Sequence, residues 1–210
     1  MEKFDFKKEY KDLYMPKTEP SIVTVPEMKF IAVRGKGDPN TSPEYKQAMK
    51  ILYGLSFTIK MSKMSGSQPD GYFEYVVPPL EGFWSVDDGI FDGLNITDKS
   101  KFHWISVIRQ PDFVTESVFE QARTEAEKKK KTDMSKAEFI TVSEGLCVQS
   151  MHIGSYDSEP STILKMREYA EKNGYSEDLS DTRLHHEIYL SDPRRCAPER
   201  LKTVIRHPIK

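Results

Sequence analysis

Apolar positions in the first half of the chain change from strand-like to helical spacing and back again. A short apolar run over residues 30–33 precedes a helical pattern, and Pro43 stands where proline suits the first helical turn. The runs over residues 72–77 and 102–108 have the length and composition of strands. Helical spacing returns over residues 115–131, with acidic residues at the start and lysines at the end. This half is predicted to be strand–helix–strand–strand, followed by a linking helix.

The second half shows the same succession of patterns. A strand-like run over residues 145–153 is followed by a helical pattern that opens at Pro160. Gly174 stands where a glycine commonly ends a helix. Strand-like runs over residues 184–190 and 201–206 complete the half, which is therefore also predicted to be strand–helix–strand–strand.

Three pairs of residues suggest that the two halves arose by duplication. The pairs are Gly37 and Gly154, Pro43 and Pro160, and Glu74 and Glu187. Members of the first two pairs are each 117 positions apart, and those of the third pair are 113 apart. Any α+β chain can show such a succession of elements, but the shared offset of turn glycine and helix-opening proline favours a repeat.

The predicted fold is α+β, with two tandem modules around a central ligand cleft. Residues 1–25 are expected to form an N-terminal arm and residues 26–210 the domain. Within the domain, module one covers about residues 28–112 and module two about 140–210, with the linking helix between them. Each small sheet is expected to bury one face under its own helix, so that the other faces meet at a cleft.

Composition excludes several classes of protein. The 31 basic and 33 acidic residues leave a net charge of −2, whereas nucleic-acid-binding domains are usually strongly basic. No stretch approaches the roughly 18 consecutive apolar residues of a membrane span. The N-terminus is charged, unlike a signal peptide, and two cysteines cannot form a disulfide framework. A cytoplasmic protein is predicted, with no direct binding of nucleic acid or membrane.

Common phosphate and metal motifs are missing. Gly35 and Gly37 lack the further residues of a dinucleotide or Walker loop, and are predicted to form a turn. His185 and His186 are neighbours on a predicted strand, so their side chains point to opposite faces and cannot easily share one ion. Neither a metal nor a cofactor is therefore predicted.

One carboxylate stands among rings in the strand over residues 184–190. Alternation places Glu187 on the same face as His185 and Tyr189. If the apolar residues of the strand pack under the helix, Glu187 faces the cleft, where apolar surroundings raise a carboxyl pKa and suit it to act as a base. The alternative is a Glu187 that is exposed to solvent or paired with Arg194 or Arg195.

Aromatic residues are dense before the midpoint of the chain. They are Tyr72, Phe73, Tyr75, Phe83, Trp84, Phe102 and Trp104. Phe83 and Trp84 follow two prolines and a glycine, in a segment expected to be too irregular for a core strand. Such a pair is a plausible wall for a flat ligand, since ring stacking adds to simple burial. The candidate ligand-binding residues are Phe83, Trp84, Tyr75, Trp104, Tyr189 and His185.

Several motifs resemble the GyrI-like small-molecule-binding proteins. The sequence His-Glu-Ile-Tyr-Leu-Ser-Asp-Pro-Arg at 186–194 is similar to the closing motif of that family. Residues 79–84 and 108–114 resemble signatures of its free-standing branch. Residues 154–160 are similar to its Gly-Pro-Tyr-Asp-Asp-Glu-Pro turn. The resemblance extends from about Met15 to the end of the chain.

The resemblance implies two modules of the SHS2 type around a ligand cleft. It places the cleft glutamate of the family at Glu187, with Tyr156, Glu159 and Trp84 as neighbours. Relatives include effector domains of multidrug-responsive transcription regulators, a small gyrase-inhibitory protein and hydrolases that open the cyclopropane ring of DNA-alkylating natural products. The implied catalytic residues are Glu187, Tyr156 and Glu159.

Three functions follow as hypotheses. The chain either hydrolyses strained cyclopropanoid electrophiles with a glutamate-activated water, or binds and sequesters aromatic or cationic compounds without reaction. A weaker third hypothesis is a gyrase-modulating partner, which the net charge of −2 supports poorly. The expected partner is a small molecule, and the sequence identifies no protein partner.

Overall fold

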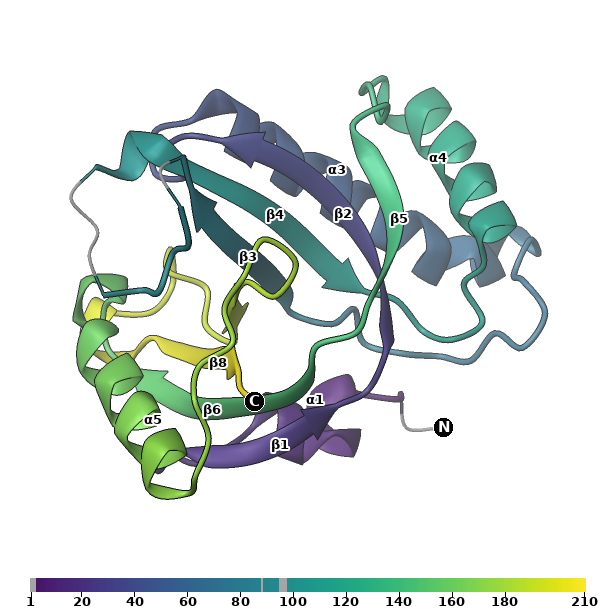
Figure 1. The fold of residues 1–210 in the computed structure, drawn as a ribbon. Helices are drawn as coiled ribbons and strands as arrows, with labels where there is room; N and C mark the ends of the chain where they lie inside the picture. The colour runs from purple at the N-terminus through teal and green to yellow at the C-terminus, as the bar shows by residue number, and fades with distance from the viewer. Residues whose placement is uncertain (1–2, 88, 95–97) are drawn as a thin grey trace.

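The computed structural model describes residues 3–87, 89–94 and 98–210, which form one eight-stranded sheet with helices on both faces (Figure 1). The strands are β1 (Ser21–Val25), β2 (Met28–Lys36), β3 (Leu80–Val86), β4 (Phe102–Arg109), β5 (Ala137–Val142), β6 (Gly145–Ile153), β7 (His185–Tyr189) and β8 (Lys202–Pro208). The α-helices are α1 (Phe6–Glu9), α2 (Lys11–Tyr14), α3 (Pro43–Met61), α4 (Glu116–Lys130) and α5 (Pro160–Lys172). The short 3₁₀ helices are η1 (Ser62–Ser65), η2 (Lys99–Lys101), η3 (Tyr156–Ser158) and η4 (Pro198–Arg200).

The order of the strands across the sheet confirms the predicted repeat. The order is β1-β6-β8-β7-β3-β4-β2-β5, and all neighbours are antiparallel. Outward from the centre, β3, β4 and β2 on one side match β7, β8 and β6 on the other. The edge strands β5 and β1 flank β2 and β6 in the same way. The sheet therefore consists of two similar halves related by an approximate two-fold axis between β3 and β7.

The paired glycines and prolines mark equivalent positions. Gly37 and Gly154 both have a positive φ, at 97° and 147°, which a residue with a Cβ rarely adopts. The helices α3 and α5 begin at Pro43 and Pro160, where the absent N–H group costs nothing. The 117-residue offset thus reflects the same local requirement in each half, a sharp turn into a helix.

The two modules join edge to edge, which differs from the predicted meeting of sheet faces. The strands β3 and β7 pair directly, with Gly82 opposite Glu187. Ile31 packs with α3 on the module-one side, and Ile205, which pairs with Glu187, packs with α5. Both helices consequently lie on the same face of one continuous sheet as Glu187. Backbone hydrogen bonds between the central strands extend the ladder through the junction and leave no sheet edge there.

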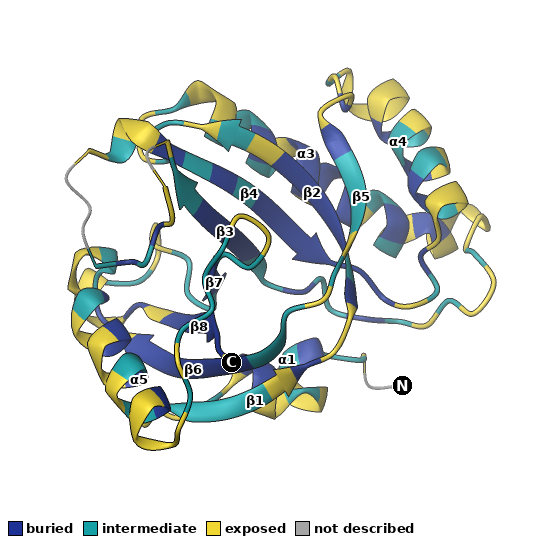
Figure 2. Cartoon of the chain, viewed as in Figure 1, coloured by how far each residue is buried: buried dark blue, intermediate teal, exposed yellow. Residues whose placement is uncertain are grey.

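The N-terminal residues cover the opposite face of the sheet. Phe6, Leu13 and Tyr14 from α1 and α2 pack in one cluster with Phe83 and Ile188. β1 pairs with β6 at the edge of the sheet. The segment predicted as an arm is therefore built into the fold, and Figure 2 shows that the buried residues follow the strands of the sheet.

One predicted strand is wrong. Residues 72–77 contain only an isolated bridge between Phe4 and Tyr75, and the strand of this region is β3, after the two prolines. Pro78 and Pro79 directly precede β3, where their missing N–H groups interrupt no ladder. Phe83 and Trp84 therefore belong to a regular central strand, and Gly82 rather than Glu74 is the counterpart of Glu187.

The remaining predicted elements agree with the structure within a few residues at each end. None of the described helices has the length and apolar character needed to cross a bilayer.

Candidate functional site

A cavity on the helix-covered face lies where the two modules meet. Its volume is about 810 Å³, and it is bounded by α3, η3, the start of α5 and the central strands β3 and β7. The residues that line it include Tyr45, Tyr53, Trp84, Tyr156, Glu159, Glu187 and Tyr189. The cleft therefore combines aromatic rings with carboxyl groups, of which Glu159 and Glu187 are buried and Asp157 and Asp192 are more exposed.

Glu187 lies on the floor of this cleft and is only 8% exposed. Its Oε1 atom is 2.8 Å from Nε2 of His185, and its Oε2 atom accepts a hydrogen bond of 2.7 Å from the Tyr189 hydroxyl. These three residues share one face of β7, as strand alternation predicts. Arg194 and Arg195 pair with Asp192 instead, so the alternative of an exposed or arginine-paired Glu187 is wrong.

Glu187 faces the cleft as predicted, but the expected reason, that the apolar residues of β7 pack under the helix, is wrong. Ile188 does not pack under α5. It packs with Phe6 and Leu13 of the N-terminal helices on the opposite face. The cleft is therefore on the helix side of the sheet, in the space between α3 and α5.

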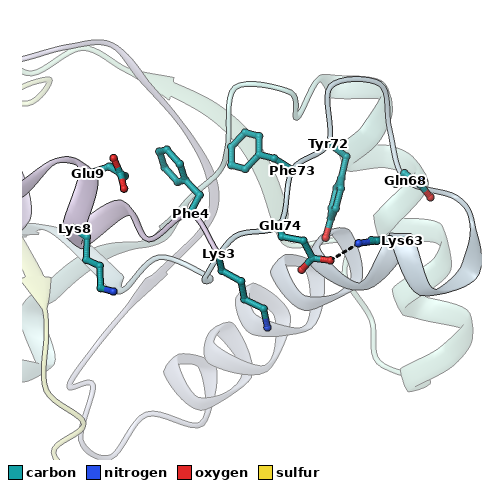
Figure 3. Close-up of a pocket in the computed structure, with 9 residues that line it drawn as sticks. All are labelled: Lys3, Phe4, Lys8, Glu9, Lys63, Gln68, Tyr72, Phe73 and Glu74. Atoms are coloured by element: carbon teal, nitrogen blue, oxygen red, sulfur yellow. Dashed lines mark hydrogen bonds and ion pairs between the residues drawn. The ribbon is translucent and has the colours of Figure 1, made fainter. Parts of the chain in front are cut away.

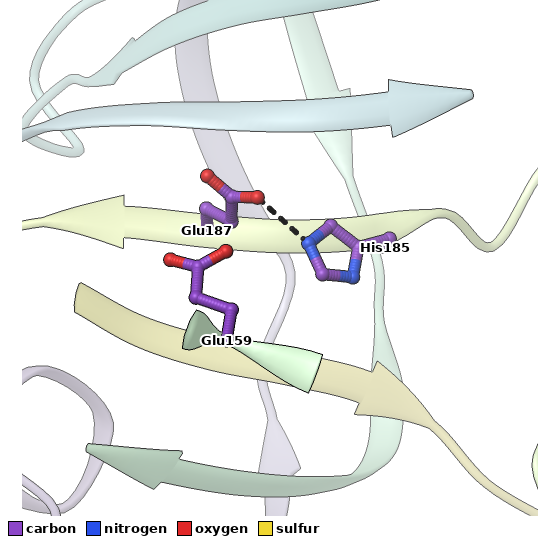
Figure 4. Close-up of side chains that lie close together, drawn as sticks. All are labelled: Glu159, His185 and Glu187. Carbon is purple, nitrogen blue, oxygen red and sulfur yellow. Dashed lines mark hydrogen bonds and ion pairs between the residues drawn. The ribbon is translucent and has the colours of Figure 1, made fainter. Parts of the chain in front are cut away.

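Glu159 brings the second carboxyl group to the cleft floor. It precedes the first residue of α5 and is 5% exposed. Burial, together with the neighbouring charge of Glu187, raises the pKa of Glu159 well above its usual range. Its Oε1 atom has no hydrogen-bond partner among the described residues. The two carboxyl groups lie close together in Figure 4, which is why the charge of Glu187 favours the protonated form of Glu159.

Among the described residues, Glu159, His185 and Glu187 form the one group that could hold a metal ion. The ligand atoms of Glu159, His185 and Glu187 lie within 4.8 Å of one another, and all three residues are buried. His185 Nε2 already shares a hydrogen bond with Glu187, so a metal ion would have to replace that bond. Sequence analysis correctly separated His186, which lies between Glu81 and Glu144 on the other face, but it did not bring Glu159 to His185.

A pair of ring residues covers the carboxylate. Trp84 Nε1 donates a hydrogen bond of 3.0 Å to the Tyr189 hydroxyl, which in turn donates to Glu187. The pKa of Tyr189 is raised well above its usual range by burial and by the charge of Glu187, so the hydroxyl keeps its proton. Gly82 makes this contact possible, because a Cβ there would lie 2.8 Å from Trp84 Nε1 and 3.0 Å from the Tyr189 oxygen.

Tyrosines form the sides of the cleft. Tyr45 from α3 stacks on Trp84 at 6.5 Å between ring centroids, and Tyr156 meets Tyr189 edge to face at 5.9 Å. Burial raises the pKa of Tyr45 to about 12 and raises that of Tyr156 as well, so both remain hydrogen-bond donors. Sequence analysis missed Tyr45 and Tyr53, although their spacing with Met49 marks one helical face.

Four of the six proposed ligand-binding residues lie outside the lining of the cleft. Phe83 is on the opposite face, stacked on His186 at 4.1 Å. Tyr75 packs beside Phe113 on that same side of the sheet. Trp104 is on the cleft face but is only 1% exposed, with its ring edge-on to Tyr45. His185 lies just beneath the floor, in contact with Glu187.

A second cavity of about 630 Å³ lies near the N-terminus (Figure 3). It has two acidic residues, Glu9 and Glu74. Glu74 forms an ion pair with Lys63, and the side chains of this pair are more than one-third exposed. This surface lacks the buried carboxyl groups of the central cleft and is a weaker candidate for chemistry.

Comparison with known proteins gives a consistent family assignment. Residues 18–210 match the family described as the GyrI-like small molecule binding domain. Among curated proteins, none matches the chain in sequence. The chain is similar to the crystal structure of a hydrolase from Listeria innocua, with 45% identity and a TM-score of 0.90, covering 99% of this chain and 100% of that one.

Two further structures are similar to the chain, one at high and one at low sequence identity. An uncharacterized conserved protein from Listeria innocua is 47% identical with a TM-score of 0.93, covering 99% of this chain and all of that one. The C-terminal domain of EcmrR is 14% identical with a TM-score of 0.50, covering 91% of this chain and 96% of that one, which shows a shared fold alone.

Proposed function

The chain belongs to the GyrI-like small-molecule-binding family, and we propose that its central cleft hydrolyses a flat aromatic molecule at a strained electrophilic carbon. The observation that carries the proposal is the pair of carboxyl groups at the cleft floor, Glu187 and Glu159. The pKa of Glu159 is raised, so one acid is held neutral beside a carboxylate that two neighbouring groups hydrogen-bond. Unequal carboxyl groups of this kind are suited to act as acid and base.

The walls of the cleft indicate the class of ligand. Trp84 and Tyr45 present ring faces and edges on one side, and Tyr156 lies on the other. A planar molecule between them gains stacking and burial of apolar surface. The cavity of about 810 Å³ falls within the roughly 300–1,000 Å³ of typical small-molecule sites.

The proposed reaction opens a three-membered carbon ring that is conjugated to a carbonyl group. Glu187 takes a proton from a water molecule as the water oxygen bonds to the strained carbon. The ring C–C bond breaks, and its electron pair moves through the conjugated system to the carbonyl oxygen. That oxygen receives a proton from Glu159, while the Tyr156 hydroxyl stabilises the developing charge as a hydrogen-bond donor.

Tyr189 has a different role in this scheme. Its hydroxyl already donates to Glu187 and accepts from Trp84. It therefore orients the carboxylate and is not available to the oxyanion. The hydrolase names of two Listeria innocua neighbours, at 45% and 46% identity over nearly the whole chain, support a hydrolytic reaction. In a cell, this reaction would inactivate DNA-alkylating compounds of the cyclopropanoid class.

The test is turnover of such a compound in molar excess over the protein. Glu187→Gln keeps the size of the side chain and removes the base, so the rate should fall by roughly 10²–10⁴-fold with the fold intact. Asp157→Asn is the matched control, because Asp157 also lines the cleft but is exposed and paired with Lys99. Equal rates for the two variants would contradict the proposed role of Glu187.

A second candidate function is binding without reaction. An ionised Glu187 beneath the rings of Trp84 and Tyr45 also suits an aromatic cation, because both the charge and the ring faces attract it. Consumption of one equivalent of compound and no more would favour this function. Glu187→Gln should then weaken cationic ligands and leave neutral planar ligands bound.

A further inference from the structure

A chain of buried hydrogen bonds leads from the cleft floor through the interior of module two. His185 Nε2 lies 2.8 Å from Glu187, and His185 Nδ1 lies 2.7 Å from Nε2 of His207 on the neighbouring strand β8. His207 Nδ1 then lies 2.9 Å from Glu177 Oε1, in the segment that follows α5. Both histidines are at most 1% exposed. Every ring nitrogen of His185 and His207 therefore has a titratable partner.

Proton counting shows that this chain needs one more proton than its neutral histidines carry. Each of the three contacts requires one hydrogen between its two heavy atoms. Two neutral imidazoles supply two of these hydrogens, and two ionised carboxylates supply none. The third proton must therefore lie on a carboxyl group or on one of the rings, because without it two lone pairs would face each other in a buried contact.

The surroundings stabilise this third proton at the cleft end of the chain. Arg167 pairs with Glu177 at 2.7 Å, and this arginine and His207 keep the pKa of Glu177 lowered against the effect of its burial. With Glu177 ionised and one additional proton present, the chain together with Arg167 carries no net charge. Neutrality is the favourable state for a buried group of this kind.

Other charged and titratable groups face the two ends. At the Glu187 end they are Glu159, Tyr189, Tyr45, Tyr156 and His152, and at the Glu177 end they are Arg167 and, through it, Asp92. The aromatic ring of Phe91 packs edge-on against His185 and adds no charge. None of these groups lies between the two histidines.

We propose that His185 and His207 form a proton relay between the cleft floor and the surface carboxylate Glu177. In one state, protonated Glu187 donates to His185 Nε2, and each ring donates from its Nδ1 to the next acceptor. Moving each bridging proton one position along leaves Glu187 ionised, both rings protonated at Nε2 and Glu177 protonated. One proton equivalent has then crossed the module, with no atom gained or lost.

The relay gives the cleft a second connection to solvent. The side chain of Glu177 is 18% exposed, so it can exchange its proton with water at the end of α5. A flat ligand over Glu187 would block exchange through the cleft mouth, and the relay would still remove the proton that Glu187 takes from water. This purpose rests on the proposed function, but the relay itself is a property of the ligand-free protein. His185, His207 and Glu177 are thus positioning residues that act through Glu187.

Nitrogen-15 NMR of histidine-labelled, ligand-free protein tests the relay without any substrate. The chain has five histidines, and single substitutions His185→Gln and His207→Gln would assign the two signals. Near neutral pH we expect either both rings protonated at Nδ1 or one imidazolium shared between them. Two neutral rings, with His185 protonated only at Nε2 and His207 protonated only at Nδ1, would overturn the proposal, because no proton would then lie between the rings. This measurement is independent of turnover, so its failure would leave the proposed hydrolysis untouched.

A pair of variants then tests the far end of the chain. Glu177→Gln removes the charge that holds the additional proton, so the protonation pattern of the His185 and His207 ring nitrogens should shift in the nitrogen-15 spectrum. Asp92→Asn is the matched control, because Asp92 contacts the same Arg167 at 3.4 Å but touches neither histidine. The control should leave that pattern unchanged. No shift in Glu177→Gln, or equal shifts in both variants, would overturn the relay.

Discussion

Gly82 and Glu187 face each other directly across the central pair of strands, at the approximate two-fold axis of the molecule. The two halves of the repeat thus differ most at their shared centre, where one has no side chain and the other has a buried carboxylate. The space above Gly82 holds the contact between Trp84 and Tyr189. Loss of a side chain in one module therefore creates room for the hydrogen bonds that orient Glu187 from the other.

Gly82→Ala should disrupt this arrangement. The new Cβ would lie 2.8 Å from Trp84 Nε1 and 3.0 Å from the Tyr189 oxygen, so the two side chains must separate. Overpacking of this kind should cost about 1–3 kcal/mol of unfolding free energy, measured in urea, and should weaken ligand binding in the cleft. Trp84→Phe serves as the comparison variant, because it removes the N–H donor without adding volume. Unchanged stability and binding in Gly82→Ala would show that the strands adjust freely.

Trp84→Ala should affect both stability and binding. The ring is 6% exposed and packs against Tyr45 and Phe102, so its removal leaves a cavity and should cost about 3–5 kcal/mol of unfolding free energy. Binding of a flat aromatic ligand by the folded fraction should weaken by about 1–3 kcal/mol. Circular dichroism follows the unfolding and gives the folded fraction. Calorimetric titration, corrected for that fraction, measures ligand binding. A loss of stability with full affinity would assign Trp84 to the core alone.

Glu159→Gln should stabilise the protein at neutral pH. The pKa of Glu159 is raised by burial and by Glu187, so the unfolded chain loses this proton at a lower pH than the folded protein does. Stability should therefore fall as pH rises above about 4.3, with a limiting slope of about 1.4 kcal/mol per pH unit until the raised pKa is reached. The amide has no proton to lose. Urea unfolding at pH about 4 and about 7 should show a gain for the variant only at the higher pH.

The same substitution should reduce turnover, because Glu159 supplies a proton in the proposed reaction. The pH profile distinguishes this role from a structural one. The rate of the wild-type protein should fall as pH rises through the raised pKa of Glu159, and that alkaline limb should be missing in Glu159→Gln. An alkaline limb that persists in the variant would assign it to another group.

His186 should make stability depend on pH from the opposite face of the sheet. Burial alone would lower the pKa of His186, but the carboxylates of Glu144 and Glu81 outweigh it, and the pKa is raised. The stabilising charge is fully present below the unfolded pKa of about 6.5 and is lost as pH rises through the folded value. His186→Gln should flatten this alkaline decline in urea unfolding. An identical slope in the variant would place the titration elsewhere.

Glu144 belongs to the same cluster and should make stability depend on pH in the acidic range. Burial opposes its ionisation, but His186 and Arg206 outweigh burial and lower the pKa of Glu144 to about 2. Its contribution is present above the unfolded pKa of about 4.3 and is lost as pH falls towards 2. Glu144→Gln leaves Arg206 buried without its carboxylate, which should cost about 3–5 kcal/mol at neutral pH. A cost below about 1 kcal/mol would show that the other partners of Arg206 suffice.

Local signals in the sequence were sufficient for the repeat and for one face of the site. The turn glycines, the helix-opening prolines and the period of two in β7 depend only on residues adjacent in the chain. They correctly predicted where α3 and α5 begin, and that Glu187 shares a face with His185 and Tyr189. The position of β3 was misjudged, because two prolines can either end a strand or precede one, and composition does not distinguish the two.

Only the tertiary structure decided how the halves meet, because strand register between distant segments has no local signature. The edge-to-edge pairing of β3 with β7 moved the cleft to the helix side of the sheet and placed Gly82 against Glu187. Pairing of β7 with β8 placed His207 beside His185. The start of α5 brought Glu159 to Glu187, and burial beside that carboxylate raised the pKa of Glu159. Desolvation depends on every surrounding side chain, so the chemistry of these carboxyl groups exists only in the folded molecule.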